Sequence, residues 1–254
     1  FYSHTIDQSL KMDDASGAYL TISSASPTAT DRKKVTISCW VKRSQITDSG
    51  VCTIFHGAGN GLMMQFLGGS NTDQLYLYES PWQIISDRLF RDAGAWMHFA
   101  LILDSTQSTD SNRSKLYING ELQDLSSWTV GSGANRYPAL NYQFTWHTGS
   151  TMRIGSVGDA SDLGGYLADF ISIDGQNVSI SDLGETNDGV WVPKDVSGLT
   201  LGDAGFYLKF DNSSDIGNDS GSNNIDFNAT NLAASDVVPD SPTLNYCNIV
   251  PMLN

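Results

Sequence analysis

The chain has 254 residues, of which 40% are hydrophobic, and 14 Lys and Arg face 28 Asp and Glu for a formal net charge of −14. This acidity argues against nucleic-acid binding, because phosphates attract basic patches, and against an anionic membrane surface. No apolar run approaches the ~18 residues of a transmembrane helix, so no membrane insertion is predicted. All-β folds often reach about 250 residues as one domain, so one large domain is allowed.

The type of acidic residue indicates the class of secondary structure. Only three acids are Glu, at Glu79, Glu121 and Glu185, and the rest are Asp. Asp favours turns and caps, whereas Glu favours helix interiors. Together with 24 Gly, this composition predicts short strands joined by polar loops.

Short segments of alternating or continuous apolar character recur along the chain and predict strands. We expect them at residues 17–22, 35–43, 51–56, 62–67, 74–78, 83–85, 96–103, 115–118, 121–122, 151–154, 165–173 and 205–210. One helical turn is expected at 179–185, capped by Ser179 or Ser181. Roughly a dozen strands with almost no helix predict an all-β, two-sheet antiparallel sandwich.

Residues 95–124 are expected to form the centre of a sheet. Residues 96–103 are apolar at nearly every position, as in a strand covered on both faces. Asn119-Gly120 supplies the two positive-φ positions of a type I′ turn. This unit is therefore predicted to be scaffold, with His98 a packed core histidine.

We expect the sandwich to span residues 1–231. Residues 232–254 hold Pro239, Pro242 and Pro251 and are expected to form an extended C-terminal linker or tail. The chain opens at Phe1 rather than Met, which favours a piece of a longer polypeptide.

Cys39, Cys52 and Cys247 show no zinc or CxxC spacing. If residues 35–43 and 51–55 pair as a hairpin, Cys39 and Cys52 lie on opposite faces and cannot form a disulfide. A one-residue change of register would reverse that arrangement. Buried free thiols are the favoured interpretation.

Five short motifs follow one another between residues 18 and 173. They are Trp40-Val41-Lys42, Trp96 with His98, Leu116 to Gly120, Arg153-Ile154-Gly155, and Gly165 to Asp169. Their order resembles the laminin-G-like (concanavalin A-like) jelly-roll domain. The resemblance implies a two-sheet jelly roll.

A narrower resemblance covers nearly the whole chain. Its motifs are Phe90-Arg91-Asp92, Ile173 to Gln176, Gly189 to Lys194, Gly205 to Phe210 and Asp240 to Thr243. They look like uncharacterised structural proteins of marine bacteriophages. This resemblance implies an oligomeric virion module on the capsid or tail surface, a decoration or a head or tail fibre domain, with other virion proteins as partners.

No catalytic residues are predicted. Glucanases with a concanavalin A-like fold carry two Glu and an Asp closely spaced on one strand, but the three Glu here lie far apart and no Glu-x-Asp pattern occurs. A Gly-x-Ser-x-Gly nucleophile elbow is also missing from the sequence. The chain is therefore expected to be non-enzymatic.

Two loops are candidate Ca²⁺ sites, because the resembled family often holds this ion with Asp, Asn and carbonyl oxygens. The candidates are Asp219, Asn224 and Asp226 in one loop and Asp159 with Asp162 in the other. Ca²⁺ takes six to eight oxygens, so water would have to complete either set. The alternative is Asx turns at hairpin ends, which need no metal.

Residues 126–150 combine aromatic and polar side chains suited to recognition. The candidates for glycan or partner binding are Trp128, Tyr137, Tyr142, Trp146 and His147. Aromatic residues are also enriched at protein interfaces, and they can simply pack on the sandwich. The leading hypothesis is a virion module in which these residues mediate subunit contact and host attachment. The alternative is a lectin that recognises host-surface glycan through residues 126–150 and 155–164.

Overall fold

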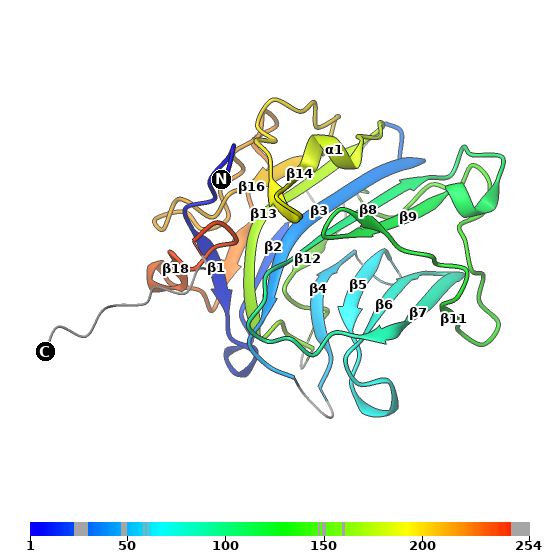
Figure 1. Ribbon diagram of the computed structural model, residues 1–254, viewed down its shortest axis with the longest axis horizontal. Helices are drawn as coiled ribbons and strands as arrows, with labels where there is room; N and C mark the ends of the chain where they lie inside the picture. Colours follow the sequence, from blue (N-terminus) through cyan, green and yellow to red (C-terminus); the bar gives the residue numbers. More distant parts are fainter. Residues whose placement is uncertain are drawn as a thin grey trace, which may run out of the picture.

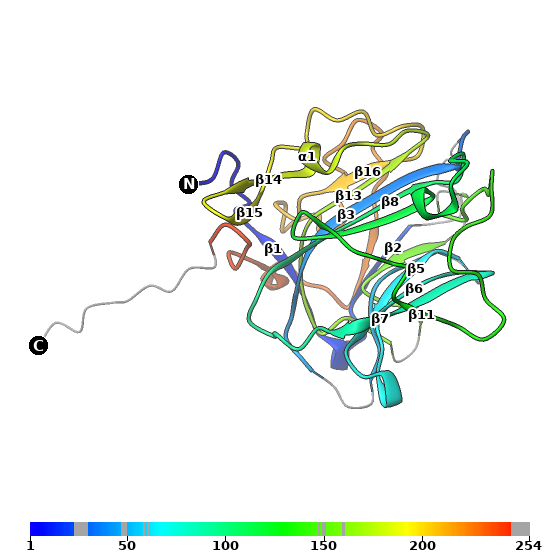
Figure 2. The same ribbon diagram turned by 45° about the vertical axis from the view of Figure 1, so that its right-hand side comes forward.

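The computed structural model describes residues 1–22, 30–46, 50–57, 59, 61–146, 148, 151–158 and 161–244. In this part of the chain two large antiparallel sheets lie face to face (Figures 1 and 2). The predicted all-β jelly-roll sandwich is therefore confirmed. No helix in the described residues has the length and apolar character needed to span a bilayer.

Sheet A runs in the order β10-β9-β8-β3-β13-β1-β18, and β16 also pairs with β13. Its strands are β1 (Ser9–Met12), β3 (Lys34–Arg43), β8 (Met97–Asp104), β9 (Ser114–Ile118), β10 (Glu121–Leu122), β13 (Gly165–Asp174), β16 (Phe206–Leu208) and β18 (Val237–Val238). The β3 strand lies between β8 and β13, both antiparallel to it.

Sheet B runs in the order β11-β7-β6-β5-β4-β12-β2-β17. Its strands are β2 (Tyr19–Ile22), β4 (Cys52–His56), β5 (Met63–Phe66), β6 (Gln74–Glu79), β7 (Trp82–Leu89), β11 (Thr129–Val130), β12 (Met152–Ile154) and β17 (Asn228–Thr230). A separate hairpin is formed by β14 (Gly184–Asn187) and β15 (Val190–Pro193), next to helix α1 (Ile180–Leu183). Short 3-10 turns lie at Asp14–Ser16, Gly69–Asn71, Asp110–Asn112 and Ala234–Asp236.

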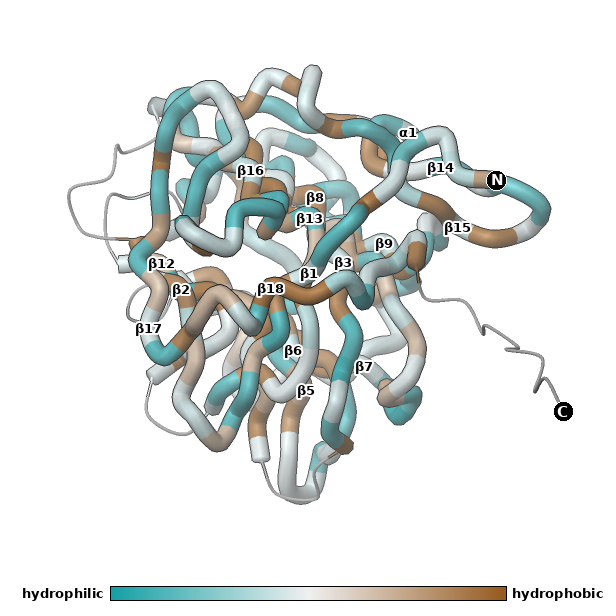
Figure 3. The backbone as a smooth tube through the Cα atoms, turned by 90° about the vertical axis from the view of Figure 1, so that its left-hand side faces the viewer, coloured by the Kyte–Doolittle hydropathy of each residue, from teal (hydrophilic) through white to brown (hydrophobic). Residues whose placement is uncertain are grey.

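The main core lies between the two sheets. Val35, Ile37, Cys39 and Val41 of β3 all belong to it, as the period-two pattern of a strand requires. Brown, hydrophobic residues recur along the strands in Figure 3, whereas many of the connecting loops are teal or white.

The outer face of sheet A is covered as well. Helix α1 and the β14–β15 hairpin lie over it (Figure 2), and Leu183 and Val196 pack with Ala100 and Ile171 of the sheet. Every residue of β8 is consequently buried. This double coverage explains the nearly unbroken apolar run at residues 96–103.

Two sequence predictions about strand neighbours are corrected. The unit β8-β9-β10 forms one end of sheet A rather than its centre, which β3 occupies. The strands at 35–43 and 51–56 do not form a hairpin, because β3 belongs to sheet A and β4 belongs to sheet B. Cys39 and Cys52 are buried free thiols, and burial raises the pKa of Cys39. Cys247 lies outside the described residues.

The segment after residue 231 is not an extended tail where the structure describes it. The β18 strand pairs with β1, and the two are neighbours in Figure 3. Asp240 pairs with Lys42 and accepts the indole N–H of Trp96 at 3.2 Å. Polar side chains thus attach residues 237–243 to sheet A, which a composition rich in proline did not predict. Residues 245–254 lie outside the described part.

Candidate functional site

The β6–β7 hairpin directs two polar side chains into the interior. Burial alternates along β6, so Leu75, Leu77 and Glu79 face inward. Trp82 faces Glu79 across the hairpin and also points inward. Glu79 and Trp82 are only 1% and 2% exposed. The end of this hairpin therefore places a carboxyl group and an indole N–H side by side at the edge of the core.

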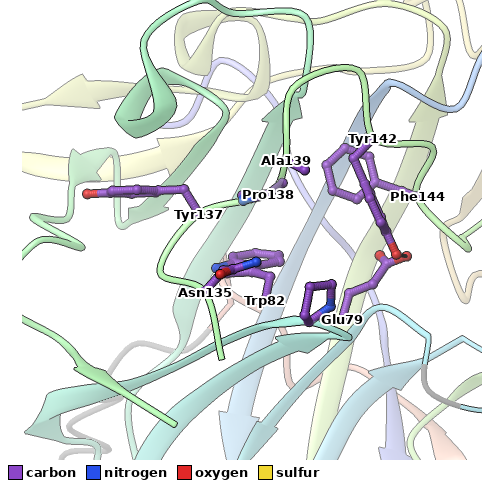
Figure 4. Close-up of a pocket in the computed structure, with 9 residues that line it drawn as sticks. Glu79, Trp82, Asn135, Tyr137, Pro138, Ala139, Tyr142 and Phe144 are labelled. Carbon is purple, nitrogen blue, oxygen red and sulfur yellow. Dashed lines mark hydrogen bonds between the residues drawn. The ribbon is translucent and has the colours of Figure 1, made fainter. Parts of the chain in front are cut away.

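The loop of residues 135–144 forms the opposite wall of a hollow above these two side chains (Figure 4). The Asn135 N–H donates to the Pro81 carbonyl at 2.8 Å, and Gln83 N–H donates to the Asn135 carbonyl at 3.1 Å. These bonds hold the loop against the hairpin. The hollow has an accessible volume of about 10 Å³, roughly the space of one water molecule. Its lining residues are Glu79, Pro81, Trp82, Asn135, Tyr137, Pro138, Ala139, Tyr142 and Phe144.

Among the residues that the structure describes, hydrogen-bond partners are found for one oxygen of Glu79 and not for the other. Oε1 accepts the Thr145 N–H at 2.6 Å and the Tyr142 hydroxyl at 3.1 Å, and Figure 4 shows Tyr142 directed at this carboxyl. Oε2 of Glu79 and Nε1 of Trp82 are buried and have no hydrogen-bond partner among the described residues. Buried polar atoms are normally paired, so each such exception requires an explanation.

Burial sets the protonation of this site. It raises the pKa of Glu79 to about 7, against the opposing effect of the hydrogen bonds from Thr145 and Tyr142. Burial and the adjacent Glu79 also raise the pKa of Tyr142. The hydroxyl of Tyr142 therefore stays protonated and donates, while Glu79 changes charge close to neutral pH.

A second, more open groove adjoins the hollow. Tyr137 lines both of them. The groove continues past Ser111, Asn112, Ser114 and Lys115 on one side and Leu122 to Leu125 on the other. Its accessible volume is about 300 Å³, so the groove, rather than the hollow, can accommodate the body of an extended ligand.

The structure separates the aromatic residues predicted for recognition into two groups. Tyr137 and Tyr142 are half-buried and line the hollow. Trp128 and Trp146 are 4% and 0% exposed, and the Trp146 indole donates to Ser172 at 2.8 Å. These two indoles pack in the main core, so neither ring presents a face to a ligand. His147 lies outside the described residues.

Sequence reasoning overlooked Glu79 and Trp82. The signal was present, because the alternation of strand 74–79 places position 79 on the same face as Leu75 and Leu77. A glutamate at an inward-facing position is unusual and indicates a special environment.

In the acidic loop at residues 211–226, the carboxylates of Asp219 and Asp226 accept hydrogen bonds from backbone N–H groups. Oδ1 of Asp219 accepts the N–H groups of Tyr207 and Gly221 at 2.8 Å, and its Oδ2 accepts that of Ile225 at 2.9 Å. Asp226 in turn accepts the N–H of Asp219 at 2.9 Å. Asn224 is exposed and adopts a left-handed φ of 52°. These bonds match the Asx-turn alternative.

The second candidate metal loop contributes to an open groove. Asp162 lines it with Asp14, Tyr19 and Arg153, and Asp159 lies outside the described residues. Within the described ranges, no cluster of three or more His, Cys, Asp or Glu side chains is arranged to hold a metal ion. Calcium binding remains a prediction from the sequence.

The comparison with protein families agrees with this fold. The model described as the concanavalin A-like lectin/glucanases superfamily (Laminin_G_3) matches residues 14–170. The chain belongs to this superfamily. The laminin-G-like resemblance seen in the sequence is therefore confirmed, whereas the relationship to bacteriophage proteins stays a prediction. No curated protein matches the chain.

The chain also resembles solved structures at low sequence identity. A candidate carbohydrate-binding protein from Bacteroides ovatus superposes with a TM-score of 0.63 at 14% identity over 96% of this chain. The present chain spans 63% of the length of that protein. A heptameric SAP-like pentraxin from Limulus polyphemus is 16% identical, covers 70% of this chain and 81% of its own, and has a TM-score of 0.45.

The superfamily description includes glucanases, so the carboxyl groups that line the hollow bear on catalysis. Glycoside hydrolysis uses two carboxyl groups, about 5–5.5 Å apart in retaining enzymes and about 6.5–9.5 Å apart in inverting enzymes. Of the described residues that line the hollow, only Glu79 carries a carboxyl group. The described lining of the hollow therefore does not contain such a pair.

Proposed function

We propose that this protein is a non-catalytic carbohydrate-binding domain that holds a glycan over the hollow between the β6–β7 hairpin and residues 135–144. The observation that carries the proposal is a buried acceptor and a buried donor, beneath a tyrosine rim, that have no hydrogen-bond partner in the described part of the chain. These atoms are Oε2 of Glu79 and Nε1 of Trp82. A ligand that supplies both missing hydrogen bonds offsets the cost of burying them.

The composition of the rim suits a sugar. Tyr137 and Tyr142 combine an apolar ring with a hydroxyl, and aromatic side chains of this kind bind amphipathic partners. The groove beyond Tyr137 adds amide, hydroxyl and ammonium groups from residues such as Asn112, Ser111 and Lys115. A glycan carries many hydroxyl groups and alternating apolar ring faces, so it matches both surfaces.

Two further observations support the proposal. The superfamily contains lectins, and the Bacteroides ovatus structure, a candidate carbohydrate-binding protein, shares the fold over nearly the whole chain. The single carboxyl in the hollow supports a binding role over a hydrolytic one. The virion role stays a separate proposal, and labelling intact particles with an antibody to this domain would test it.

The test is a glycan array followed by calorimetric titration of the glycans that bind. We expect Tyr137→Ala to weaken binding about tenfold or more, because it removes the ring shared by the hollow and the groove. Tyr2→Ala is the matched control, since Tyr2 lies in the N-terminal segment and contacts Phe1. A folded wild-type protein that binds no glycan, or a Tyr137→Ala variant that binds as tightly as the control, would contradict the proposal.

A further inference from the structure

The hollow selects one small chemical group rather than a whole sugar ring. Its accessible volume of about 10 Å³ is roughly the space of one water molecule, far below the roughly 300–1,000 Å³ of pockets that enclose drug-sized ligands. Glu79 and Trp82 lie at its buried end, while Pro81, Asn135 and Ala139 are exposed. A ligand can therefore reach the unpaired polar atoms only with a substituent that projects from its ring.

Oε2 of Glu79 and Nε1 of Trp82 would both be paired by a ligand group that can donate one hydrogen bond and accept another. Oε2 of ionised Glu79 accepts a hydrogen bond, whereas Nε1–H of Trp82 can only donate. A hydroxyl supplies one donor and two lone pairs, so it can satisfy either atom or both. At a pH above the Glu79 pKa of about 7, a carboxylate or a sulfate has no proton to give and places a second negative charge beside Glu79, which is unfavourable in a buried site.

The apolar side chains that line the hollow favour a ligand group that carries apolar hydrogens as well as a hydroxyl. Pro81, Pro138, Ala139 and Phe144 surround the path to the buried end. A secondary hydroxyl is attached directly to a sugar ring, so the ring would have to enter with it. A primary hydroxyl stands on a rotatable methylene arm, whose apolar hydrogens can contact these walls.

Resting on the carbohydrate-binding function proposed above, we propose that the hollow takes the exocyclic hydroxymethyl group of a neutral hexose. The hydroxyl bonds to Glu79 and Trp82, and the ring stays at the rim beside Tyr137 and Tyr142. The ligand class is then neutral hexose glycans with a free primary hydroxyl. Pentopyranoses, 6-deoxyhexoses and uronic acids lack that group.

The first experiment compares matched ligands on the wild-type protein. The probes are the methyl glycosides of glucose, galactose and mannose. Each is measured by calorimetry or saturation-transfer NMR beside its 6-deoxy and uronic acid counterparts, at a pH above the Glu79 pKa of about 7. We expect each binding hexose to lose about tenfold or more in affinity when the primary hydroxyl is removed or oxidised, because buried polar atoms are then left unpaired. A 6-deoxy sugar that binds within about twofold of its parent overturns this inference.

The second experiment assigns the selectivity to the two side chains. Trp82→Phe keeps an aromatic ring but removes the N–H, so the preference for the hexose over its 6-deoxy form should shrink severalfold. Glu79→Gln removes the charge, so discrimination against the uronic acid should shrink. Trp96→Phe is the control, because its indole N–H bonds to Asp240 rather than lining the hollow, and its selectivity should equal that of the wild type.

The outcomes separate the two proposals. If no hexose or larger glycan binds the folded wild-type protein, the carbohydrate-binding function itself is wrong. If glycans bind but the primary hydroxyl has no effect, only the present inference is wrong. Unchanged selectivity in Trp82→Phe and Glu79→Gln also overturns it.

Discussion

Trp191 donates its indole N–H to Nδ1 of His98 at 3.1 Å. This bond joins the β14–β15 hairpin to the outer face of β8. Because Nδ1 accepts, the proton of the neutral imidazole is on Nε2, which lies 2.8 Å from the hydroxyl of Ser38 on β3. One buried histidine thus connects the hairpin with two neighbouring strands of sheet A, and the outer layer depends on its staying neutral.

The stability of the protein should fall in acid because of His98. Burial lowers its pKa from 6.5 to about 3. Between these values the unfolded chain binds a proton that the folded chain does not, so stability decreases as the pH falls through this window. The slope for one proton is about 1.4 kcal/mol per pH unit. Urea unfolding at stepped pH should show a smaller acid slope in His98→Gln, and an unchanged slope would contradict the assignment.

Glu79 should contribute the opposite slope. Its pKa rises from 4.5 to about 7 on folding, so the folded chain retains a proton that the unfolded chain has lost. Stability therefore decreases as the pH rises from about 4.5 to about 7, again by up to about 1.4 kcal/mol per pH unit.

Glu79→Gln makes this contribution measurable. The slopes from Glu79 and His98 oppose each other between about 4.5 and 6.5 in the wild type. The variant should therefore gain stability with rising pH over that range more steeply than the wild type does. Parallel curves for the two proteins, measured by urea unfolding, would show that Glu79 does not hold its proton in the fold.

Gly120 should tolerate no side chain. It has a φ of 78°, and a Cβ there would lie 2.3 Å from Cε3 of Trp191. Gly133 has a similar φ of 74° with no atom within 4 Å of its Cβ position. Gly120→Ala and Gly133→Ala should each cost about 1–2 kcal/mol in backbone strain. The contact with Trp191 should add about 1–3 kcal/mol of overpacking at Gly120 alone. Equal free energies of unfolding for the two variants would refute the contact.

Asp73 should be essential to the end of sheet B at β6. Its Oδ1 accepts from Arg43 at 2.8 Å, with both side chains only 1% exposed, and its Oδ2 accepts from the exposed Arg91 at 3.1 Å. Removing one partner of a buried ion pair leaves an uncompensated charge and costs about 3–5 kcal/mol. Asp73→Ala should show this loss in chemical denaturation.

Arg91→Ala is the control for Asp73, because its side chain is 59% exposed. Exposed ion pairs contribute about 0–1 kcal/mol. If both variants lost the same stability, the buried Arg43 contact would not be the reason.

Asp219 should stabilise its loop without calcium. Asp219→Asn replaces one of the two accepting oxygens with an amide NH2 group that cannot accept, so one backbone N–H loses its partner and we expect a loss of about 1–3 kcal/mol. That loss should be the same in EDTA and in excess Ca²⁺. Asp226→Asn keeps an oxygen for the Asp219 N–H and serves as the control. A calcium-dependent rise in wild-type melting temperature that Asp219→Asn abolishes would instead establish a metal site.

The sequence predicted some residues of the candidate site and missed others. Tyr137 and Tyr142 were predicted from the concentration of aromatic residues at 126–150, and both line the hollow. Trp128 and Trp146 come from the same stretch but are core residues. Composition reports which side chains are available, but it does not report the direction in which an irregular loop points them.

The unit at residues 95–124 shows which features the sequence determines and which depend on the tertiary structure. Its strands and the positive-φ turn at Asn119-Gly120 followed from the sequence alone, because strand periodicity and turn geometry are local properties. Its position at one end of sheet A, the crossing of the chain between β3 and β4, and the meeting of Glu79 with residues 135–144 did not. Those features depend on contacts between segments far apart in the chain, and only the tertiary structure, which must bury both faces of sheet A, decided them.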